Sequence, residues 1–106
     1  LGTDFPVEKV NPVHTFYSSV ERKDLKGYPE NGFQMENSLS REETLKGMTI
    51  WGAYFNFEEH EKGSLEVGKS ADFVVLNQNI MEVEADLIPN TEVLQTYIDG
   101  ELVYSK

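Results

Sequence analysis

The sequence contains no cysteine and few basic residues. The absence of cysteine from its 106 residues excludes a disulfide framework, a thiolate zinc site and a cysteine nucleophile. Nine lysine and arginine residues stand against nineteen aspartate and glutamate residues, which leaves a formal net charge of −10. A charge of this sign repels phosphate backbones and anionic lipid surfaces. We therefore expect neither nucleic acid nor a membrane as a partner.

Long hydrophobic runs are also missing. No apolar run approaches the roughly 18 residues that a membrane-spanning helix needs, and the first residues lack the basic and apolar regions of a signal peptide. We expect a soluble protein. We expect it to be cytoplasmic unless a signal peptide precedes these residues. Hydrophobic residues still make up 39% of the chain and aromatic residues 11%, which is too much apolar material for a disordered tail. The chain is therefore expected to fold.

The first helix is predicted over residues 12–22. Asn11 followed by Pro12 is a typical helix start, because the asparagine side chain can cap the helix and proline fits its first position. The next apolar side chains form one stripe at helical spacing: Val13, Phe16, Tyr17 and Val20. Glycine, proline and asparagine then interrupt any periodicity, which predicts a long loop over 23–38.

A second helix is predicted to begin at Ser40, which forms a capping box with Glu43. One apolar face of this helix is expected to continue to Phe55 through Leu45, Met48 and Gly52. Trp51 and Tyr54 widen that apolar surface.

The last third of the chain has the patterns of strands. The continuous apolar run 73–76 is typical of a strand covered on both faces. Alternation over 81–85 predicts a half-exposed extended segment. Residues 92–98 and 101–104 are expected to form a hairpin around Asp99-Gly100, the preferred pair for a type I′ turn. In that register Tyr97 lies opposite Leu102, and Thr96 lies opposite Val103.

Few residues could carry chemistry. His14 and His60 do not form an H-x-H or H-x-x-x-H pair, so we interpret both as ordinary surface histidines. The acidic residues on either side of His60 point in different directions on a helix or loop, and we interpret them as solvated charge. Asp4 differs, because an acidic side chain at a strand end before Pro6 lies where (β/α)8 barrels place catalytic residues. By position alone, however, such an aspartate is more often structural.

Three segments of the sequence resemble one known family. Residues 1–7, LGTDFPV, followed by Asn11-Pro12, resemble the end of the eighth barrel strand in the amidohydrolase superfamily. Residues 63–76, GSLEVGKSADFVVL, are similar to the passage that leads from that barrel into a small β domain. Residues 96–103 are similar to the terminal hairpin of the family. In residues 16–22 and in the loop at 31–33, the sequence looks most like amidohydrolase family 3.

The resemblance implies an α+β fragment of a larger enzyme. Residues 1–62 would supply the last strand end and helices of a (β/α)8 barrel, and residues 63–106 the C-terminal strands of a small composite β-sandwich domain. The parent would be a metal-dependent hydrolase that cleaves amide or cyclic amide C–N bonds, other than ordinary peptide bonds, with water activated by a divalent metal, zinc being the first choice. Asp4 would be its catalytic base or metal ligand. Since the other ligands are absent here, the 106 residues alone are expected to be inactive.

The expected partners follow from the same resemblance. They are the remainder of the barrel, a small-molecule substrate, and a second copy of the chain, with helix 12–22 or the strand edges meeting across a homo-oligomer interface. The alternative hypothesis is a small non-enzymatic α+β binding or assembly module that docks a partner through Trp51, Tyr54 and Phe55.

Overall fold

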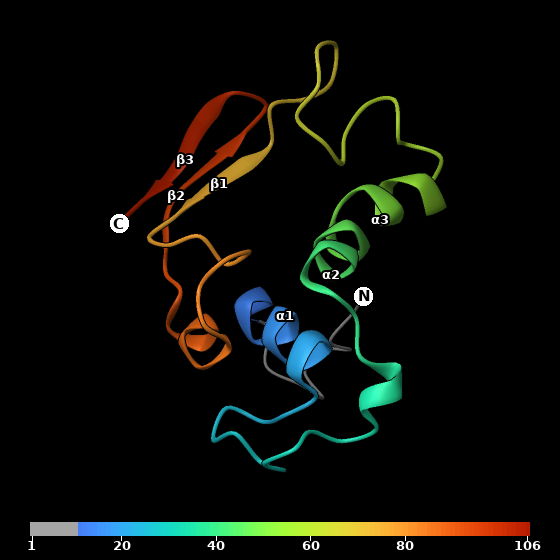
Figure 1. Ribbon diagram of the computed structural model, residues 1–106. Helices are drawn as coiled ribbons and strands as arrows, with labels where there is room; N and C mark the ends of the chain where they lie inside the picture. The colour runs from blue at the N-terminus through green and yellow to red at the C-terminus, as the bar shows by residue number, and fades with distance from the viewer. Residues whose placement is uncertain (1–10) are drawn as a thin grey trace.

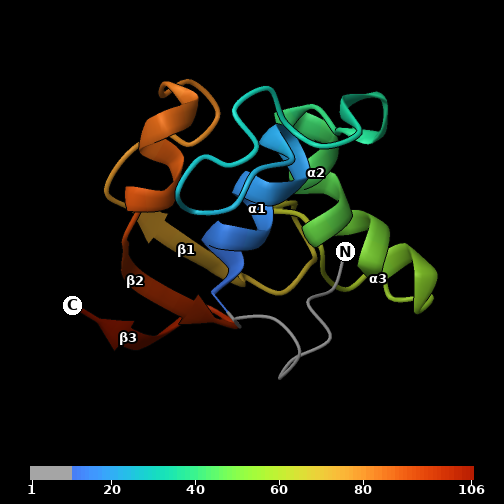
Figure 2. The same ribbon diagram turned by 90° about the horizontal axis from the view of Figure 1, so that it is seen from below.

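The computed structural model describes residues 11–106, so Asp4 lies outside the described residues. A three-stranded sheet lies on one side and α2 and α3 on the other, while α1 lies between α2 and the short helix η2 (Figure 1, Figure 2). Among these residues the elements follow in the order α1 (Pro12–Glu21), η1 (Met35–Asn37), α2 (Arg41–Met48), α3 (Ile50–Phe55), β1 (Phe73–Leu76), η2 (Ala85–Asn90), β2 (Val93–Ile98) and β3 (Glu101–Ser105).

The first helix forms as predicted. The Asn11 side chain accepts a hydrogen bond from the Val13 amide at 2.9 Å, and Pro12 occupies the first helical position. The helix ends at Glu21, because Arg22 adopts a left-handed conformation with a φ of 55°. Residues 23–38 form the expected long loop, which the short helix η1 interrupts.

The hydrophobic core is built on α1 and one side chain of η2. Phe16 and Tyr17 are only 1% and 3% exposed, and they pack with Ile88, which is fully buried. Burial raises the pKa of Tyr17, and nearby carboxylates add to the rise. The apolar stripe of α1 therefore finds partners within the described chain.

The prediction of an extended segment over 81–85 is wrong. The side chain of Asn79 accepts a hydrogen bond from the Met81 amide at 2.9 Å, and its carbonyl accepts from the Val83 amide at 3.0 Å. These bonds begin a turn that leads into η2. Asparagine commonly forms such turns by bonding the backbone two residues ahead, and the alternation of apolar residues concealed that local preference.

The second predicted helix is broken at Thr49. It begins at the expected capping box, with Ser40 and Glu43 bonded to each other's backbone amides. Thr49 has φ −129° and ψ −97°, and its hydroxyl donates to the Leu45 carbonyl at 2.7 Å. A threonine hydroxyl that bonds the carbonyl four residues back bends helices. The apolar face is consequently not continuous, and Phe55 is 83% exposed.

The sheet has the order β1-β2-β3, with both pairs antiparallel. The hairpin is confirmed, since Asp99 and Gly100 have φ values of 51° and 76°, as a type I′ turn requires. Tyr97 lies opposite Leu102 as predicted. Thr96 lies opposite Tyr104 instead of Val103, because the register shifts between Thr96 and Tyr97. A bulge of this kind adds a residue to one strand.

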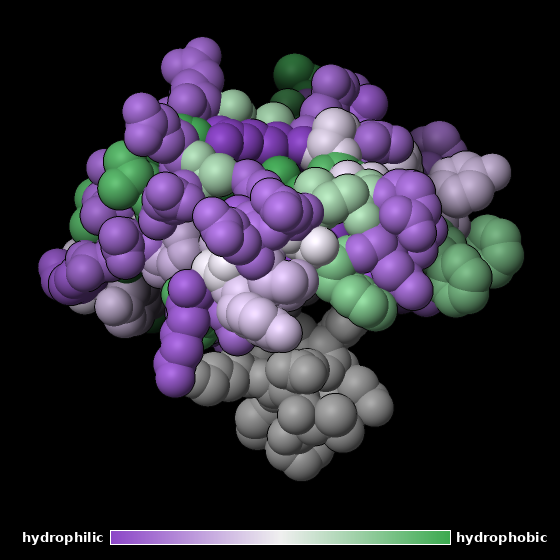
Figure 3. All heavy atoms as spheres, turned by 60° about the horizontal axis from the view of Figure 1, so that its bottom comes forward, coloured by the Kyte–Doolittle hydropathy of each residue, from purple (hydrophilic) through white to green (hydrophobic). Residues whose placement is uncertain are grey.

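The prediction that the strand 73–76 is covered on both faces is wrong. Phe73 stacks on Tyr97 with ring centroids 4.5 Å apart, but Val74 and Val75 are exposed. Hydrophilic and apolar side chains mix on the face shown in Figure 3. Among residues 11–106 only five apolar residues are buried, while nineteen large hydrophobic residues are exposed. Most of the apolar surface therefore has no cover within the described chain.

Replacing Ile88 tests the small core. We expect Ile88→Ala to lower the free energy of unfolding by about 2–5 kcal/mol, because it removes buried methyl groups and leaves a cavity against α1. Leu87→Ala is the matched control, since Leu87 is the neighbouring residue and is 46% exposed. Urea unfolding of both variants measures the difference, and equal losses would contradict a core centred on Ile88.

Candidate functional site

No metal centre is found among residues 11–106. No group of three or more histidine, cysteine, aspartate or glutamate side chains in that part of the chain could hold a metal ion. Asp4, the predicted catalytic residue and metal ligand, precedes it. The described residues therefore do not fit a metal by themselves. Over the same residues, no helix has the length and apolar character needed to cross a membrane.

The histidine His14 lies in the first turn of α1 and is half-buried. Its Nε2 is 3.5 Å from the Asn11 amide nitrogen. Its Nδ1 is buried and has no hydrogen-bond partner. His14 is therefore partly buried, which the helical pattern did not indicate because the position lies beside the apolar stripe.

The second histidine, His60, has a side chain that is 92% exposed, in agreement with a surface position. Its Nε2 lies 3.7 Å from Glu59. Glu58 pairs with Lys62 one helical turn further on, and this pairing raises the pKa of Lys62. The acidic residues around His60 thus form separate local pairs and do not converge on one point.

The passage after α3 is a tightly packed junction. Gly63 has a φ of 99°, a conformation that favours glycine. A Cβ atom there would lie 2.9 Å from the Ala53 Cβ and 3.0 Å from the Ile50 Cα. Any larger residue at Gly63 would therefore push the junction away from α3.

The polar side chains of the junction bind one another. Lys69 is nearly buried, and its Nζ donates to Ser64 Oγ at 2.8 Å and lies 2.9 Å from Glu66 Oε2. The Ser64 hydroxyl also donates to Glu66. A serine beside a lysine can form a nucleophilic pair, but here the Ser64 hydroxyl donates its hydrogen bond to Glu66 and accepts one from Lys69. The cluster Ser64-Glu66-Lys69 therefore fixes the turn.

The end of the junction binds the hairpin. Asp72 Oδ1 accepts a hydrogen bond from the Asp99 amide at 2.8 Å, and the Ala71 carbonyl accepts from Gly100 at 2.9 Å. The segment 63–76 and the terminal hairpin, two separate parts of the family resemblance, thus contact each other. The role of Asp72 is to hold the hairpin turn, which its neighbours in the sequence did not reveal.

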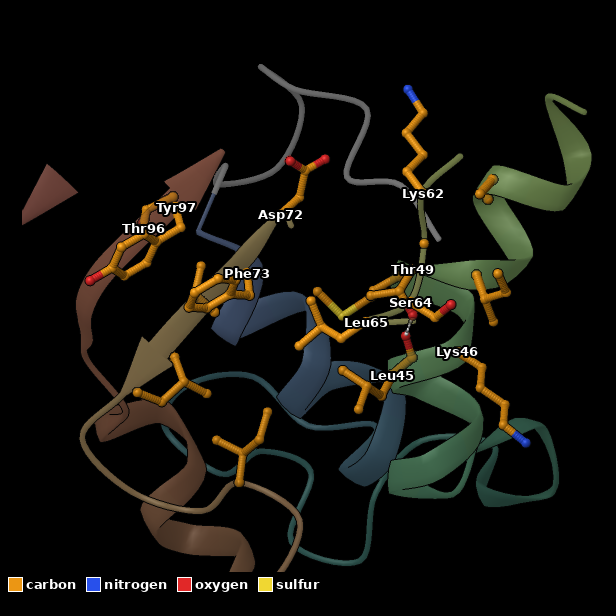
Figure 4. A pocket seen from close by; sticks show the side chains of 18 of the residues that line it. Leu45, Lys46, Thr49, Lys62, Ser64, Leu65, Asp72, Phe73, Thr96 and Tyr97 are labelled. Atoms are coloured by element: carbon orange, nitrogen blue, oxygen red, sulfur yellow. Dashed lines mark hydrogen bonds between the residues drawn. The ribbon is translucent and has the colours of Figure 1, made fainter. Parts of the chain in front are cut away.

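A groove of about 1630 Å³ runs between the helices α2 and α3 and the strand β1. Figure 4 shows apolar and small side chains that point into it from both sides and from the junction, among them Leu45, Thr49, Leu65 and Phe73. Lys46 and Lys62 point away from it (Figure 4) and pair with glutamates of their own segments. The groove is an apolar surface without a cluster of charged groups at its centre.

Comparison with known proteins identifies the chain. Residues 1–104 match the Amidohydrolase family. The chain is 35% identical over 104 residues to Protein LONG AFTER FAR-RED 3 of Arabidopsis thaliana, covering 98% of this chain and 17% of that protein. It is 28% identical over 106 residues to the N-substituted formamide deformylase of Arthrobacter pascens, covering 100% of this chain and 19% of that protein.

A solved structure agrees with these relatives. The amidohydrolase from Thermotoga maritima MSB8 matches with a TM-score of 0.57 and 30% sequence identity, over 68% of this chain and 17% of that chain. The chain belongs to the amidohydrolase family. The predicted resemblance to amidohydrolase family 3 is confirmed. The chain spans less than a fifth of the length of the two relatives and of the solved structure.

The junction cluster gives a testable pH dependence. Hydrogen bonds from Ser64 and Lys69, together with the charge of Lys69, lower the pKa of Glu66 from its ordinary value of 4.5. A lowered carboxylate pKa stabilises the fold above the ordinary value, and the effect is lost as the pH falls through the folded value. We expect Glu66→Gln to be less stable than the wild type at pH 7, with a difference that shrinks below about pH 4.5 and vanishes in stronger acid.

Urea unfolding across that pH range measures the difference. Glu82→Gln is the control, because Glu82 is exposed on the loop before η2. A Glu66→Gln effect that stays constant with pH would show that the charge of Glu66 does not hold the turn.

Proposed function

We propose that this chain forms one part of a metal-dependent hydrolase of the amidohydrolase family. The activity would be cleavage of amide or cyclic amide C–N bonds, other than ordinary peptide bonds, in small molecules. The observation that carries the proposal is the family match over residues 1–104. It is supported by a relative whose name describes hydrolysis of N-substituted formamides.

Within this proposal Asp4 is the residue of the chain that takes part in catalysis. Its segment resembles the end of the eighth barrel strand, where the family places a catalytic aspartate. A catalytic zinc ion typically has three protein ligands, and residues 11–106 offer no group of that size. The remaining ligands would therefore come from polypeptide beyond these 106 residues, with zinc as the first metal to test.

The isolated chain is expected to be inactive. Asp4 alone cannot hold a catalytic zinc ion, so we expect no hydrolysis of amides, esters or acylated amino acids and no stoichiometric zinc site tighter than about 1 μM. Titration calorimetry with zinc and an amide hydrolysis assay measure both properties. A tight stoichiometric site would show that the chain forms a metal centre of its own.

A chimera tests the activity and the role of Asp4. In it, this chain replaces the segment that it matches in the Arthrobacter pascens deformylase, 106 residues long. We expect the chimera to hydrolyse an N-substituted formamide. Asp4→Asn should lower turnover by about 10²–10⁴-fold without unfolding the protein, because it replaces a base or ligand by a neutral amide of the same shape.

The matched control for that substitution is Asp86→Asn, which makes the same change at an exposed residue of η2. It should leave turnover unchanged. A folded chimera without activity would contradict the proposed hydrolase function. Near-normal turnover of Asp4→Asn would return Asp4 to a structural role.

The second candidate function is a binding or assembly module without catalysis. It is favoured by the exposure of Trp51, Tyr54 and Phe55, which are 49%, 68% and 83% exposed. Exposed aromatic clusters of this kind commonly mark interaction surfaces. The chimera distinguishes the two candidate functions. It can be active only if the chain completes the hydrolase, whereas a binding module without catalysis would leave the chimera inactive.

A further inference from the structure

The sequence contains one Asn-Gly pair, Asn31-Gly32, which lies in the long loop 23–38. Asn31 is exposed to solvent, and asparagine is among the chemically labile residues of proteins. Glycine has no Cβ atom to shield its backbone nitrogen, so this nitrogen has open access to the side-chain carbonyl of the preceding asparagine. The pair therefore has the chemistry of a site that modifies itself.

The modification is a deamidation that needs only water and a base. The base removes the proton of the Gly32 amide, the nitrogen forms a bond to Asn31 Cγ, and the C–N bond of the side-chain amide breaks to release ammonia. The product is a cyclic imide. Water then opens the ring: cleavage of the bond to Cγ gives aspartate, whereas cleavage of the bond to the main-chain carbonyl carbon gives isoaspartate, in which the main chain runs through the side chain.

The fold restrains the attacking nitrogen. The Gly32 amide donates to the Pro29 carbonyl at 2.8 Å, and an amide held in a hydrogen bond gives up its proton less readily. The loop is also fixed to the end of α1, because the Phe33 amide donates to the Arg22 carbonyl at 2.9 Å and Arg22 Nε donates to the Phe33 carbonyl at 3.0 Å. Exposed loops open locally at low free energy. Attack therefore requires that the turn 29–32 open first.

We propose that Asn31 is a deamidation site, that opening of the turn 29–32 sets its rate, and that isoaspartate there releases the loop from α1. The release follows from the close packing of the backbone. A Cβ atom at Gly32 would lie 2.8 Å from the Glu21 carbonyl oxygen, so little space separates this backbone from the end of α1. Isoaspartate adds one main-chain carbon directly before Gly32, which this packing does not accommodate. The inference is independent of the proposed function.

Two other asparagines of the chain provide internal controls. Asn37 and Asn56 are also exposed, but Ser38 and Phe57 follow them, and a side chain on the following residue hinders attack by its nitrogen. Exposure alone would therefore give all three asparagines similar rates, whereas the proposed chemistry makes Asn31 the first to react.

Ageing of the 106-residue chain tests the site and its rate. The chain is kept in mildly alkaline buffer below its unfolding temperature, with and without denaturing urea, and peptide mass spectrometry follows each asparagine. We expect Asn31 to react before Asn37 and Asn56. Its conversion should be at least about threefold faster in urea, since one backbone hydrogen bond has a net effect of this order. No conversion of Asn31 in the folded chain, or equal rates in both conditions, would overturn the proposal.

Two matched substitutions test the restraint by the loop. Arg22 donates to the Phe33 carbonyl, and its guanidinium lies 5.9 Å from the centroid of the Phe33 ring. Arg41 donates to the Ile80 carbonyl at 3.0 Å, away from this loop. We expect Arg22→Lys to speed the conversion of Asn31 about threefold, because it removes a hydrogen bond that holds the loop closed. Arg41→Lys should leave the rate unchanged. Equal rates in the two variants would overturn the proposed control by loop opening.

Hydrogen exchange tests the structural consequence. Chromatography separates the isoaspartate form from the unmodified chain. We expect the Phe33 amide to exchange at least about tenfold faster in the isoaspartate form, because the loop has lost its anchor on α1. Freshly prepared Asn31→Asp is the matched control, since it adds the same charge without the extra main-chain carbon, and its Phe33 amide should exchange as in the unmodified chain. Unchanged exchange in the isoaspartate form, or equally fast exchange in Asn31→Asp, would overturn the proposed release.

Discussion

The packing of Ile88 against α1 connects the two halves of this chain. Ile88 is fully buried and contacts Phe16 and Tyr17, which belong to a helix some seventy positions earlier in the sequence. A second connection is polar, because the Arg41 guanidinium donates to the Ile80 carbonyl at 3.0 Å. These contacts hold the loop before the hairpin against α1 and α2. The position of the sheet relative to the helices, and so the shape of the groove, depends on them.

Elements that local chemistry decides could be predicted from the sequence. The cap at Asn11, the capping box at Ser40 and the Asp99-Gly100 turn each involve a side chain or backbone preference acting over two to four residues. Such interactions form in the same way in many proteins, because they require no distant partner. The helix start, the second helix start and the hairpin were consequently placed correctly.

Elements that depend on competition between patterns were predicted less well. Over 81–85, the turn that Asn79 begins prevailed over apolar alternation. At Thr49, a bond between the hydroxyl and the Leu45 carbonyl prevailed over a continuous apolar face. The bulge beside Tyr97 shifted one half of the hairpin register, because strand pairing depends on the neighbouring strands as well as the turn. Asp4 stays a prediction, since it lies outside the described residues.

The family motif at residues 63–76 has a structural role in this chain. Gly63 permits close approach to α3, Lys69 binds the turn, and Asp72 binds the hairpin. These contacts position β1 at one wall of the groove. A short apolar strand without charge or proline is an aggregation hazard when it stays uncovered, and the one charged residue next to it in the sequence is Asp72, directly before Phe73. The junction therefore places an apolar strand at the edge of the described sheet, beside the groove.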